Sequence, residues 1–262
     1  MPFDLAPFSG VPAWAVLCVL GAHFLGFFIR GAFGFGSNMP IILLTTWLIG
    51  PHHAVVLVVV TASAAQVHLL PQGFKAADWP VTRPLMAGML FGVTVGTWVF
   101  TKLAADWLIL FMGGLITFVV LMDRLRVFER LPAVIDPRSR GVSMFLALVS
   151  GLVGTISGGG GLYFLVVYLK LACRTAAGLR GTSIILSGIF ILLRLGLLVL
   201  AGFVTWDVAA EAALLMPAVL FGTWAGTKSF HAIDSRRFYT ALQFVLLAAA
   251  IALLAKGAMR FA

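Results

Sequence analysis

Ten apolar runs fill most of this chain, and they restrict its fold to a helical protein that spans a membrane. Several of the runs approach the roughly 20 apolar residues that a transmembrane helix needs. Hydrophobic residues make up 61% of the 262 residues, and charged residues make up only 10%. Lipid offers the backbone no hydrogen-bond partners, so these runs must form helices rather than open strands. We therefore predict an all-α integral membrane protein with eight to ten transmembrane helices.

A polar stretch in the middle of the chain divides these runs into two sets of five. It covers residues 123–140, is rich in arginine and is too short for a domain, so we interpret it as a cytoplasmic linker. The predicted domains are a first transmembrane repeat over 1–122, the basic linker and a second transmembrane repeat over 141–262. Pro71 is expected to end the third run, because proline removes a helical hydrogen bond. The predicted segments are 13–30, 40–49, 54–70, 84–100, 107–122, 142–156, 162–171, 182–202, 208–226 and 238–255.

The two halves share a glycine pattern in the same order along the chain. A Leu-Phe-Gly-x-x-x-Gly-Thr segment occurs at 90–97 and again at 220–227. Small residues four positions apart let two helices approach closely in lipid. An odd number of segments in each half makes the halves antiparallel, so we predict an inverted repeat of two five-segment halves. The matched positions of the glycine-rich stretches are Gly31, Gly34 and Gly36 in the first half and Gly154, Ser157 and Gly159 in the second.

Each half also contains a glycine-rich stretch, at 31–40 and at 154–163, that lies between an apolar run and a shorter one. Glycine destabilises a helix interior by about 1 kcal/mol relative to alanine. Irregular backbone at membrane depth is tolerated only inside protein or beside a water-filled cavity. Interrupted apolar segments at corresponding places in two halves indicate the binding site of a transporter. We therefore expect the short segments to be broken or re-entrant helices next to such a site.

Lysine and arginine outnumber aspartate and glutamate by 18 to 9. In a soluble protein this excess would suggest a nucleic-acid partner. In a membrane protein it indicates cytoplasmic loops, so we expect a lipid bilayer and no nucleic acid. With the linker in the cytoplasm, nearly all the basic residues fall at cytoplasmic ends and both termini are external. The basic residues assigned to the outside are Lys102, Lys256 and Arg260.

No motif in the sequence indicates an enzyme, a metal site or a cofactor. The chain has no G-x-x-x-x-G-K-[ST] phosphate-binding loop. The segment 154–158 resembles the serine motif of an intramembrane protease only superficially, since no histidine lies in a second-half span to act as base. His52 and His53 have no carboxylate or cysteine near them in the sequence, so we predict a solvated pair in a loop. Cys18 and Cys173 lie among apolar residues and are interpreted as small hydrophobic side chains.

Two arginines lie within predicted spans, where a charge is unfavourable and is usually functional. Arg30 either snorkels to the cytoplasmic interface or faces the binding site. Arg194 lies about a dozen residues into its span, and it either contacts an interior carboxylate or carbonyl group or attracts an anion. Glu211 is the acidic residue that could pair with it. Because the spans contain so few carboxylates, they favour an anionic substrate over a cation.

Uncharged hydrogen-bonding groups gather near both glycine-rich stretches. A broken helix leaves unpaired N–H groups and a partial positive charge at the start of its second part, and anions bind there. We predict that this backbone binds a small anion, which Arg30 and Arg194 attract. A serine or threonine can instead bond its own backbone, and Tyr163 can instead fill the core. The other candidate residues are Gly34, Gly36, Ser37, Asn38, Gln66, Ser157, Gly159, Gly160, Gly161, Tyr163, Thr182 and Ser183.

The paired glycine-rich motifs, the duplicated halves, the basic linker and the Gly-Thr-Ser at 181–183 resemble the TauE/SafE family of sulfite exporters and toluene-sulfonate permeases. The resemblance covers nearly the whole chain. It implies secondary transport of a small sulfur-containing anion, such as sulfite, an organosulfonate or sulfoacetate, across the inner membrane of a bacterium. Ser37 and Asn38 stand where a run of glycines is common in the family. A passive anion channel and an intramembrane enzyme are the alternative functions, and a homodimer is the expected assembly.

The distribution of charge predicts the sidedness of the chain. A reporter fused after Arg130 is expected on the cytoplasmic side, and one fused after Ala262 on the external side, because basic loops stay in the cytoplasm. Paired fusions to green fluorescent protein and alkaline phosphatase measure this. Finding both fusion points on the same side would contradict the antiparallel halves.

Overall fold

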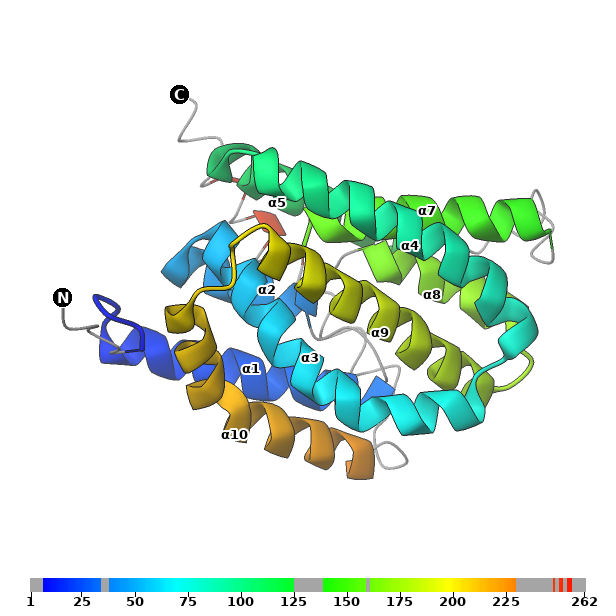
Figure 1. Ribbon diagram of the computed structural model, residues 1–262, viewed down its shortest axis with the longest axis horizontal. Coiled ribbons are helices and arrows are strands. Elements are labelled where there is room, and N and C mark those ends of the chain that lie inside the picture. The colour runs from blue at the N-terminus through cyan, green and yellow to red at the C-terminus, as the bar shows by residue number, and fades with distance from the viewer. Residues whose placement is uncertain are drawn as a thin grey trace.

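The chain is a bundle of helices (Figure 1). The structure, a computed structural model, describes residues 7–33, 38–124, 139–158 and 161–229 and positions 247, 250, 251, 254 and 255. Within these residues no strand occurs, and five helices are long and apolar enough to cross a membrane. The predicted all-α membrane fold is thus confirmed. The helices are α1 (Ala13–Phe33), α2 (Asn38–Ile49), α3 (Pro51–Ala76), α4 (Trp79–Lys102), α5 (Ala105–Arg124), α7 (Arg140–Ile156), α8 (Gly161–Ala172), α9 (Ala176–Leu200) and α10 (Trp206–Ser229).

The prediction that Pro71 ends the third helix is wrong, because α3 continues to Ala76. A proline removes one backbone hydrogen bond, and membrane helices tolerate this loss where neighbouring groups replace it. Pro217 lies inside α10 in the same way. The true ends of α3 are Gly50, which has a φ of 83°, and Ala77, whose backbone is extended.

The helices are arranged as two outer pairs around a central pair. α1 packs along α10 at one side of the bundle, and α4 packs along α7 at the opposite side (Figure 1). Between them α3 and α9 contact each other, and α3 also contacts α10 while α9 also contacts α4. Each outer pair therefore joins the first helix of one half to the fourth helix of the other.

Glycines bring the backbones of α1 and α10 into direct contact. A Cβ atom added to Gly222 would lie 2.6 Å from the carbonyl oxygen of Phe24, and one on Gly226 would lie 2.0 Å from that of Phe28. Both distances are far below van der Waals contact, so only glycine fits at these positions. Close backbone approach through small residues is a main source of helix association in lipid.

The same contact recurs between α4 and α7. A Cβ atom on Gly92 would lie 2.1 Å from the carbonyl oxygen of Leu148, and one on Gly96 would lie 2.7 Å from that of Leu152. The Leu-Phe-Gly-x-x-x-Gly-Thr segments thus use their glycines in equivalent contacts.

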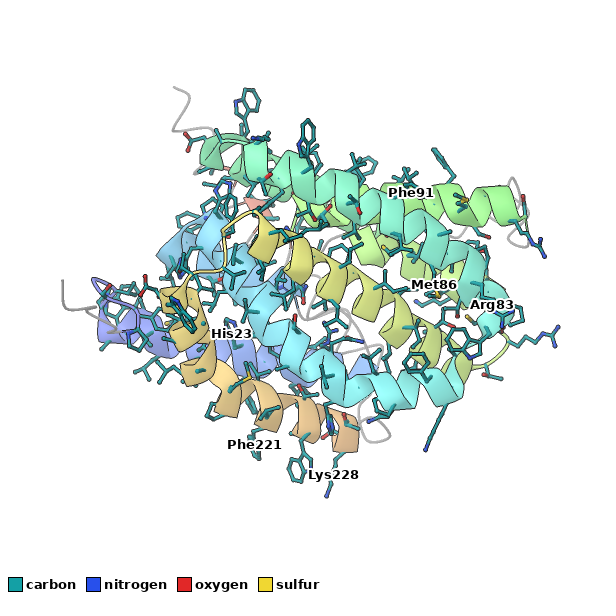
Figure 2. All side chains as sticks on the ribbon, in the orientation of Figure 1. His23, Arg83, Met86, Phe91, Phe221 and Lys228 are labelled. Atoms are coloured by element: carbon teal, nitrogen blue, oxygen red, sulfur yellow. The ribbon has the colours of Figure 1, made fainter. Side chains whose placement is uncertain are left out.

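The two contacts also agree in register. The glycines on α4 precede those on α10 by 130 residues, and the carbonyl residues on α7 follow those on α1 by 124. The phenylalanines beside the glycines, Phe91 and Phe221, project outward on opposite sides of the bundle (Figure 2). Packing of this kind is consistent with a duplicated chain, and the inverted repeat remains our proposal.

The two short helices do not have the length to cross a bilayer. α2 and α8 contain 12 residues each, or about 18 Å at 1.5 Å per residue, against a hydrocarbon core of about 30 Å. Most residues of α2 are buried, so this helix lies inside the bundle. Only Gly50 separates α2 from α3, and its positive φ makes the sharp turn that glycine readily adopts. Both short helices begin in a glycine-rich stretch, and α2 lies within the protein.

We expect Gly226→Leu to destabilise the protein, because the new side chain must separate α1 from α10. Overpacking of this kind lowers the free energy of unfolding by about 1–3 kcal/mol. Gly196→Leu is the control, since a Cβ atom there has no neighbour within 4 Å in the described residues. Thermal unfolding of the purified proteins, followed by circular dichroism, measures the difference. Equal unfolding temperatures for the two variants would contradict the close packing of α1 and α10.

Candidate functional site

The candidate site lies along one face of α9, which crosses the interior of the bundle beside α3 (Figure 1). Arg180, Ser183, Ser187 and Arg194 follow one another at intervals of three, four and seven residues. With 3.6 residues per turn, these intervals place all four on one side of the helix. The two serines and Arg194 are buried, and Arg180 is half-buried. We call these four residues the polar face of α9.

Arg194 forms one end of the polar face. Its Nη2 donates a hydrogen bond to the carbonyl oxygen of Thr155 at 2.5 Å, and its guanidinium carbon lies 4.8 Å from the centre of the Phe100 ring. Thr155 is the last residue but one of α7, and the last four carbonyl groups of a helix have no partner within it. The arginine therefore caps the end of α7 at the start of the second glycine-rich stretch, where a positive charge is favourable.

Several buried donors on this face have no hydrogen bond in the part of the chain that the structure describes. They are Nε and Nη1 of Arg194 and the hydroxyl groups of Ser183 and Ser187. Arg194 is 0% exposed, and buried polar groups in proteins are nearly always hydrogen-bonded. A row of such groups on one helix face, with a guanidinium at its end, indicates a place for a ligand that accepts hydrogen bonds.

Arg180 forms the other end of the polar face. Its Nη2 donates to the carbonyl oxygen of Gly31 at 3.1 Å, and its Nη1 donates to Oε1 of Gln72 at 3.3 Å. Gly31 lies in the last turn of α1, just as Thr155 lies in the last turn of α7. Two arginines of one helix thus bind the two helix ends that precede the glycine-rich stretches. Fourteen residues separate these arginines along the chain, which corresponds to about 21 Å along α9.

A further polar contact joins three helices near the middle of α9. Nη2 of Arg30 donates to Oε1 of Gln66, and Nε2 of Gln66 donates to the carbonyl oxygen of Ile184 at 2.8 Å. These residues belong to α1, α3 and α9. Arg30 is 2% exposed, so the interpretation that it snorkels to the interface is wrong, and its charge lies inside the bundle. Sequence reasoning identified Arg30 and Gln66 separately, and the structure brings them together.

The depth predicted for Arg194 needs correction. The predicted span began at residue 182, whereas α9 begins at Ala176 and ends at Leu200. Arg194 is therefore six residues from the end of the helix, or about 9 Å, rather than at its centre.

Two of the predicted site residues make structural contacts instead. The hydroxyl oxygen of Thr182 accepts a hydrogen bond from the backbone N–H of Asp78 at 3.1 Å and lies 3.0 Å from the hydroxyl of Thr82. These bonds tie α9 to the start of α4. Ser157 donates to the carbonyl oxygen of Val153, four residues earlier, at 2.8 Å. The alternative of a local backbone bond therefore describes Ser157.

Part of each glycine-rich stretch, at 34–37 and at 159–160, lies outside the described residues. Asn38 is buried and is the first residue of α2, while Gly161 is the first residue of α8, which also contains Tyr163. The start of each short helix thus falls where the sequence predicts it, and backbone binding there stays a prediction. The residues outside the description are Gly34, Gly36, Ser37, Gly159 and Gly160, together with the side chain of Tyr163.

The interpretation of His52 and His53 as a solvated pair is wrong. The ring of His52 lies 5.1 Å from that of Phe100 and 6.1 Å from that of Phe203. Nε2 of His53 lies 2.5 Å from Oε2 of Glu211, a carboxylate that is 158 residues away in the sequence. Glu211 therefore pairs with His53 and is not the partner of Arg194. Among the described residues no cluster of three His, Cys, Asp or Glu side chains could hold a metal ion.

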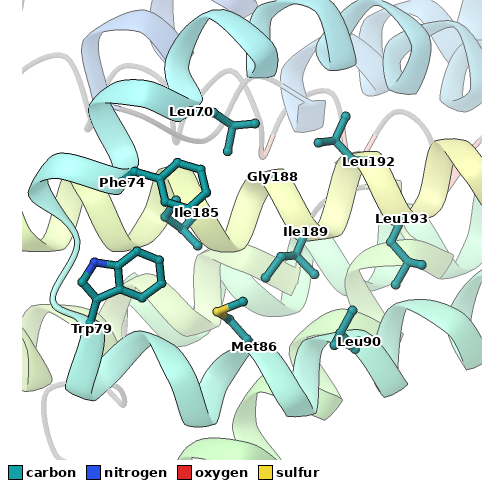
Figure 3. A pocket seen from close by; sticks show the side chains of 10 residues that line it. All are labelled: Leu70, Phe74, Trp79, Met86, Leu90, Ile185, Gly188, Ile189, Leu192 and Leu193. Carbon is teal, nitrogen blue, oxygen red and sulfur yellow. The ribbon is translucent and has the colours of Figure 1, made fainter.

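A lateral groove of about 320 Å³ lies between α3, α4 and α9 (Figure 3). Its lining is apolar and includes Leu70, Phe74, Trp79, Met86 and Gly188. A Cβ atom on Gly188 would lie 2.9 Å from Nε2 of Gln66, so this glycine separates the groove from the polar contact behind it. With no charged side chain in its lining, the groove is unsuited to an anion. The polar face of α9 is the candidate site.

Comparison with known protein families gives one result that covers most of the chain. Residues 18–253 match the family model described as "Sulfite exporter TauE/SafE". Neither the curated proteins nor the solved structures gave a match.

Gln66 links Arg30 to Ile184, so we expect Gln66→Leu to lower the stability of the bundle. Interhelical hydrogen bonds in membranes contribute up to about 1–2 kcal/mol. Gln66→Glu is the matched comparison, because it keeps an acceptor for Arg30, loses the donor to Ile184 and adds a charge that Arg30 balances. Thermal unfolding in detergent should rank the wild type first, Gln66→Glu second and Gln66→Leu last. If Gln66→Leu unfolds at the temperature of the wild type, the contact does not stabilise the bundle.

Proposed function

Since the match over residues 18–253 shows that the chain belongs to the TauE/SafE family of membrane transporters, we propose that it is a secondary transporter of a small sulfur-containing anion. The substrate class includes sulfite, organosulfonates and sulfoacetate. The membrane is the inner membrane of a bacterium, with the arginine-rich linker in the cytoplasm. The observation that supports this proposal most directly is the row of unpartnered donors on the polar face of α9.

A sulfonate or sulfite group complements these donors. Its oxygens accept several hydrogen bonds and carry negative charge, whereas the guanidinium of Arg194 and the hydroxyls of Ser183 and Ser187 can all donate. Hydrogen bonds to charged groups contribute roughly 1.5–3 kcal/mol each, so two or three of them offset much of the loss of hydration of a monovalent anion. Within the described residues no carboxylate lies within ion-pair distance of Arg194 to compete for it.

The polar face of α9 also supplies a path along which an anion could move. Arg180 and Arg194 stand at its two ends, about 21 Å apart along α9, and the two serines lie between them. An anion attracted to either end would find donors at successive turns of the same helix. The pair α1 and α10 and the pair α4 and α7, each held together by its own glycine contacts, would move relative to each other and open this face to one side of the membrane at a time.

A passive anion channel is the alternative that uses the same groups. Binding to Arg194 and the serines gives a limited number of sites, so uptake into proteoliposomes should saturate with substrate concentration. Flux that rises in proportion to concentration would favour the channel.

We expect Arg194→Gln to weaken anion binding at least about tenfold, or about 1.4 kcal/mol. Arg30→Gln should weaken it less, because Arg30 is bonded to Gln66. Arg83→Gln is the control, since Arg83 is exposed near the start of α4 (Figure 2). A thermal-shift titration of the detergent-purified protein with sulfite, methanesulfonate and sulfoacetate measures the affinity, because a ligand of the folded state raises its stability. Unchanged binding in Arg194→Gln, or a preference for cations, would overturn the proposed site.

A further inference from the structure

Glu211 is a buried acid whose partners come from distant parts of the chain. It lies six residues into α10, and its side chain is 8% exposed. One carboxylate oxygen lies 2.5 Å from Nε2 of His53, at the start of α3. The other accepts a hydrogen bond of 3.3 Å from the backbone N–H of Phe8, in the turn before α1. Three segments therefore meet at one carboxylate.

The histidine of this pair is accessible, whereas the carboxylate is enclosed. The side chain of His53 is 35% exposed, and it occupies the first turn of α3, where the helix emerges from the bundle. Histidine gains and loses a proton between about pH 5 and 8. A proton can thus reach the pair through His53 without passing through the core, and Glu211 can stabilise the imidazolium that results.

The turn held by Glu211 is strained. Phe8 has a φ of 61°, in the left-handed region that is unfavourable for a bulky side chain. The hydrogen bond to Glu211 favours this conformation, and α1 begins five residues later at Ala13. The pair of Glu211 and His53 therefore lies beside the segment that leads into α1.

Other charged groups near this end of the bundle do not replace the pair. In the described part of the chain, His53 is the basic side chain within ion-pair distance of Glu211. The segment 7–12 and α2 contain no titratable side chain. The other titratable side chains that the structure describes on these elements are Cys18, His23 and Arg30 on α1, His52, His68 and Lys75 on α3, Arg83 and Lys102 on α4, Asp106 on α5, Arg180 and Arg194 on α9, and Asp207 and Lys228 on α10.

A short chain of ring contacts connects the pair to the anion site. His52, the neighbour of His53, lies 5.1 Å from the ring of Phe100, and the guanidinium of Arg194 lies 4.8 Å from the centre of the same ring. One aromatic side chain therefore touches both the arginine proposed to bind the anion and the helix turn that carries His53. The pair and Arg194 therefore lie at the same end of the bundle, on either side of this ring.

From these contacts we propose that His53 and Glu211 form a proton-binding site, and that a proton bound there accompanies the anion bound at Arg194. With a neutral imidazole and an ionised carboxylate, the pair carries one negative charge. Nδ1 of His53 takes up a proton from water while Nε2–H still donates to Glu211, so the pair becomes neutral overall. Loss of the negative charge removes a repulsion from an anion arriving at this end of the bundle. The inference rests on the proposed function, since it requires an anion at Arg194.

Because proton binding and anion binding would be thermodynamically linked, the inference can be measured in detergent solution. If one proton binds with each anion, affinity must rise as pH falls, by up to about tenfold per pH unit, and anion binding must take up protons. Methanesulfonate is the probe, because a sulfonate stays ionised across this pH range. Isothermal titration at several values between pH 5 and 8 gives the affinity, and a pH indicator in weakly buffered solution counts the protons.

Three variants separate the outcomes. Glu211→Gln keeps an acceptor for His53 and Phe8 but lacks the charge that stabilises the imidazolium, so the rise in affinity and the proton uptake should move to lower pH. His53→Gln keeps a donor to Glu211 but cannot titrate in this range, so binding should become independent of pH and proton uptake should fall from about one to near zero. Asp207→Asn, an exposed change on the same helix, should behave as the wild type.

The results that would overturn the inference differ from those that would overturn the proposed function. If the wild type binds methanesulfonate equally at all pH values, or if both glutamine variants keep its pH dependence, the proton site is wrong and the anion site stands. A folded Glu211→Gln that binds no anion at any pH shows that Glu211 only positions the anion site. If the wild type binds no methanesulfonate at any pH, the proposed function fails and the linked proton fails with it.

Discussion

Direct contact between glycines and carbonyl groups on two pairs of helices is the constraint on which the rest of this bundle depends. Lipid supplies little hydrophobic drive to bring apolar helices together, so close packing must do so. Gly222 and Gly226 bring the backbone of α10 against α1, and Gly92 and Gly96 bring the backbone of α4 against α7. The two pairs enclose α3 and α9, which can then carry polar side chains away from lipid.

Enclosure explains how two broken helices are tolerated. The last carbonyl groups of α1 and α7 would be unsatisfied inside a membrane, and each loss of a partner there is unfavourable by several kcal/mol. Arg180 supplies a donor to Gly31, and Arg194 supplies one to Thr155. A guanidinium has five N–H groups, so satisfying one carbonyl leaves capacity for an anion. Structural and functional interpretations of Arg194 are therefore compatible.

Much of the fold follows from the sequence, because apolar runs and glycine spacing are local signals. The membrane class and the short helices that begin in the glycine-rich stretches both came from such patterns. The end of α3 could not be predicted in this way. Proline by itself favours the end of a helix, and α3 continues past Pro71 because the surrounding protein compensates for the lost hydrogen bond. The pairing of His53 with Glu211 and of Arg30 with Gln66 could not be predicted either. Those contacts depend on which helix faces meet, and the sequence of one chain does not specify that.

The arginines that bind both helix ends come from the same helix, which makes the halves chemically unequal. α9 contributes Arg180 and Arg194, whereas α3, its counterpart in the first half, contributes the amides Gln66 and Gln72. Two copies of the first half would have acceptors but no guanidinium on the central helix, and two copies of the second would have like charges facing each other. Each half therefore depends on side chains that only the other half supplies, so neither half could form this polar interior by pairing with a copy of itself.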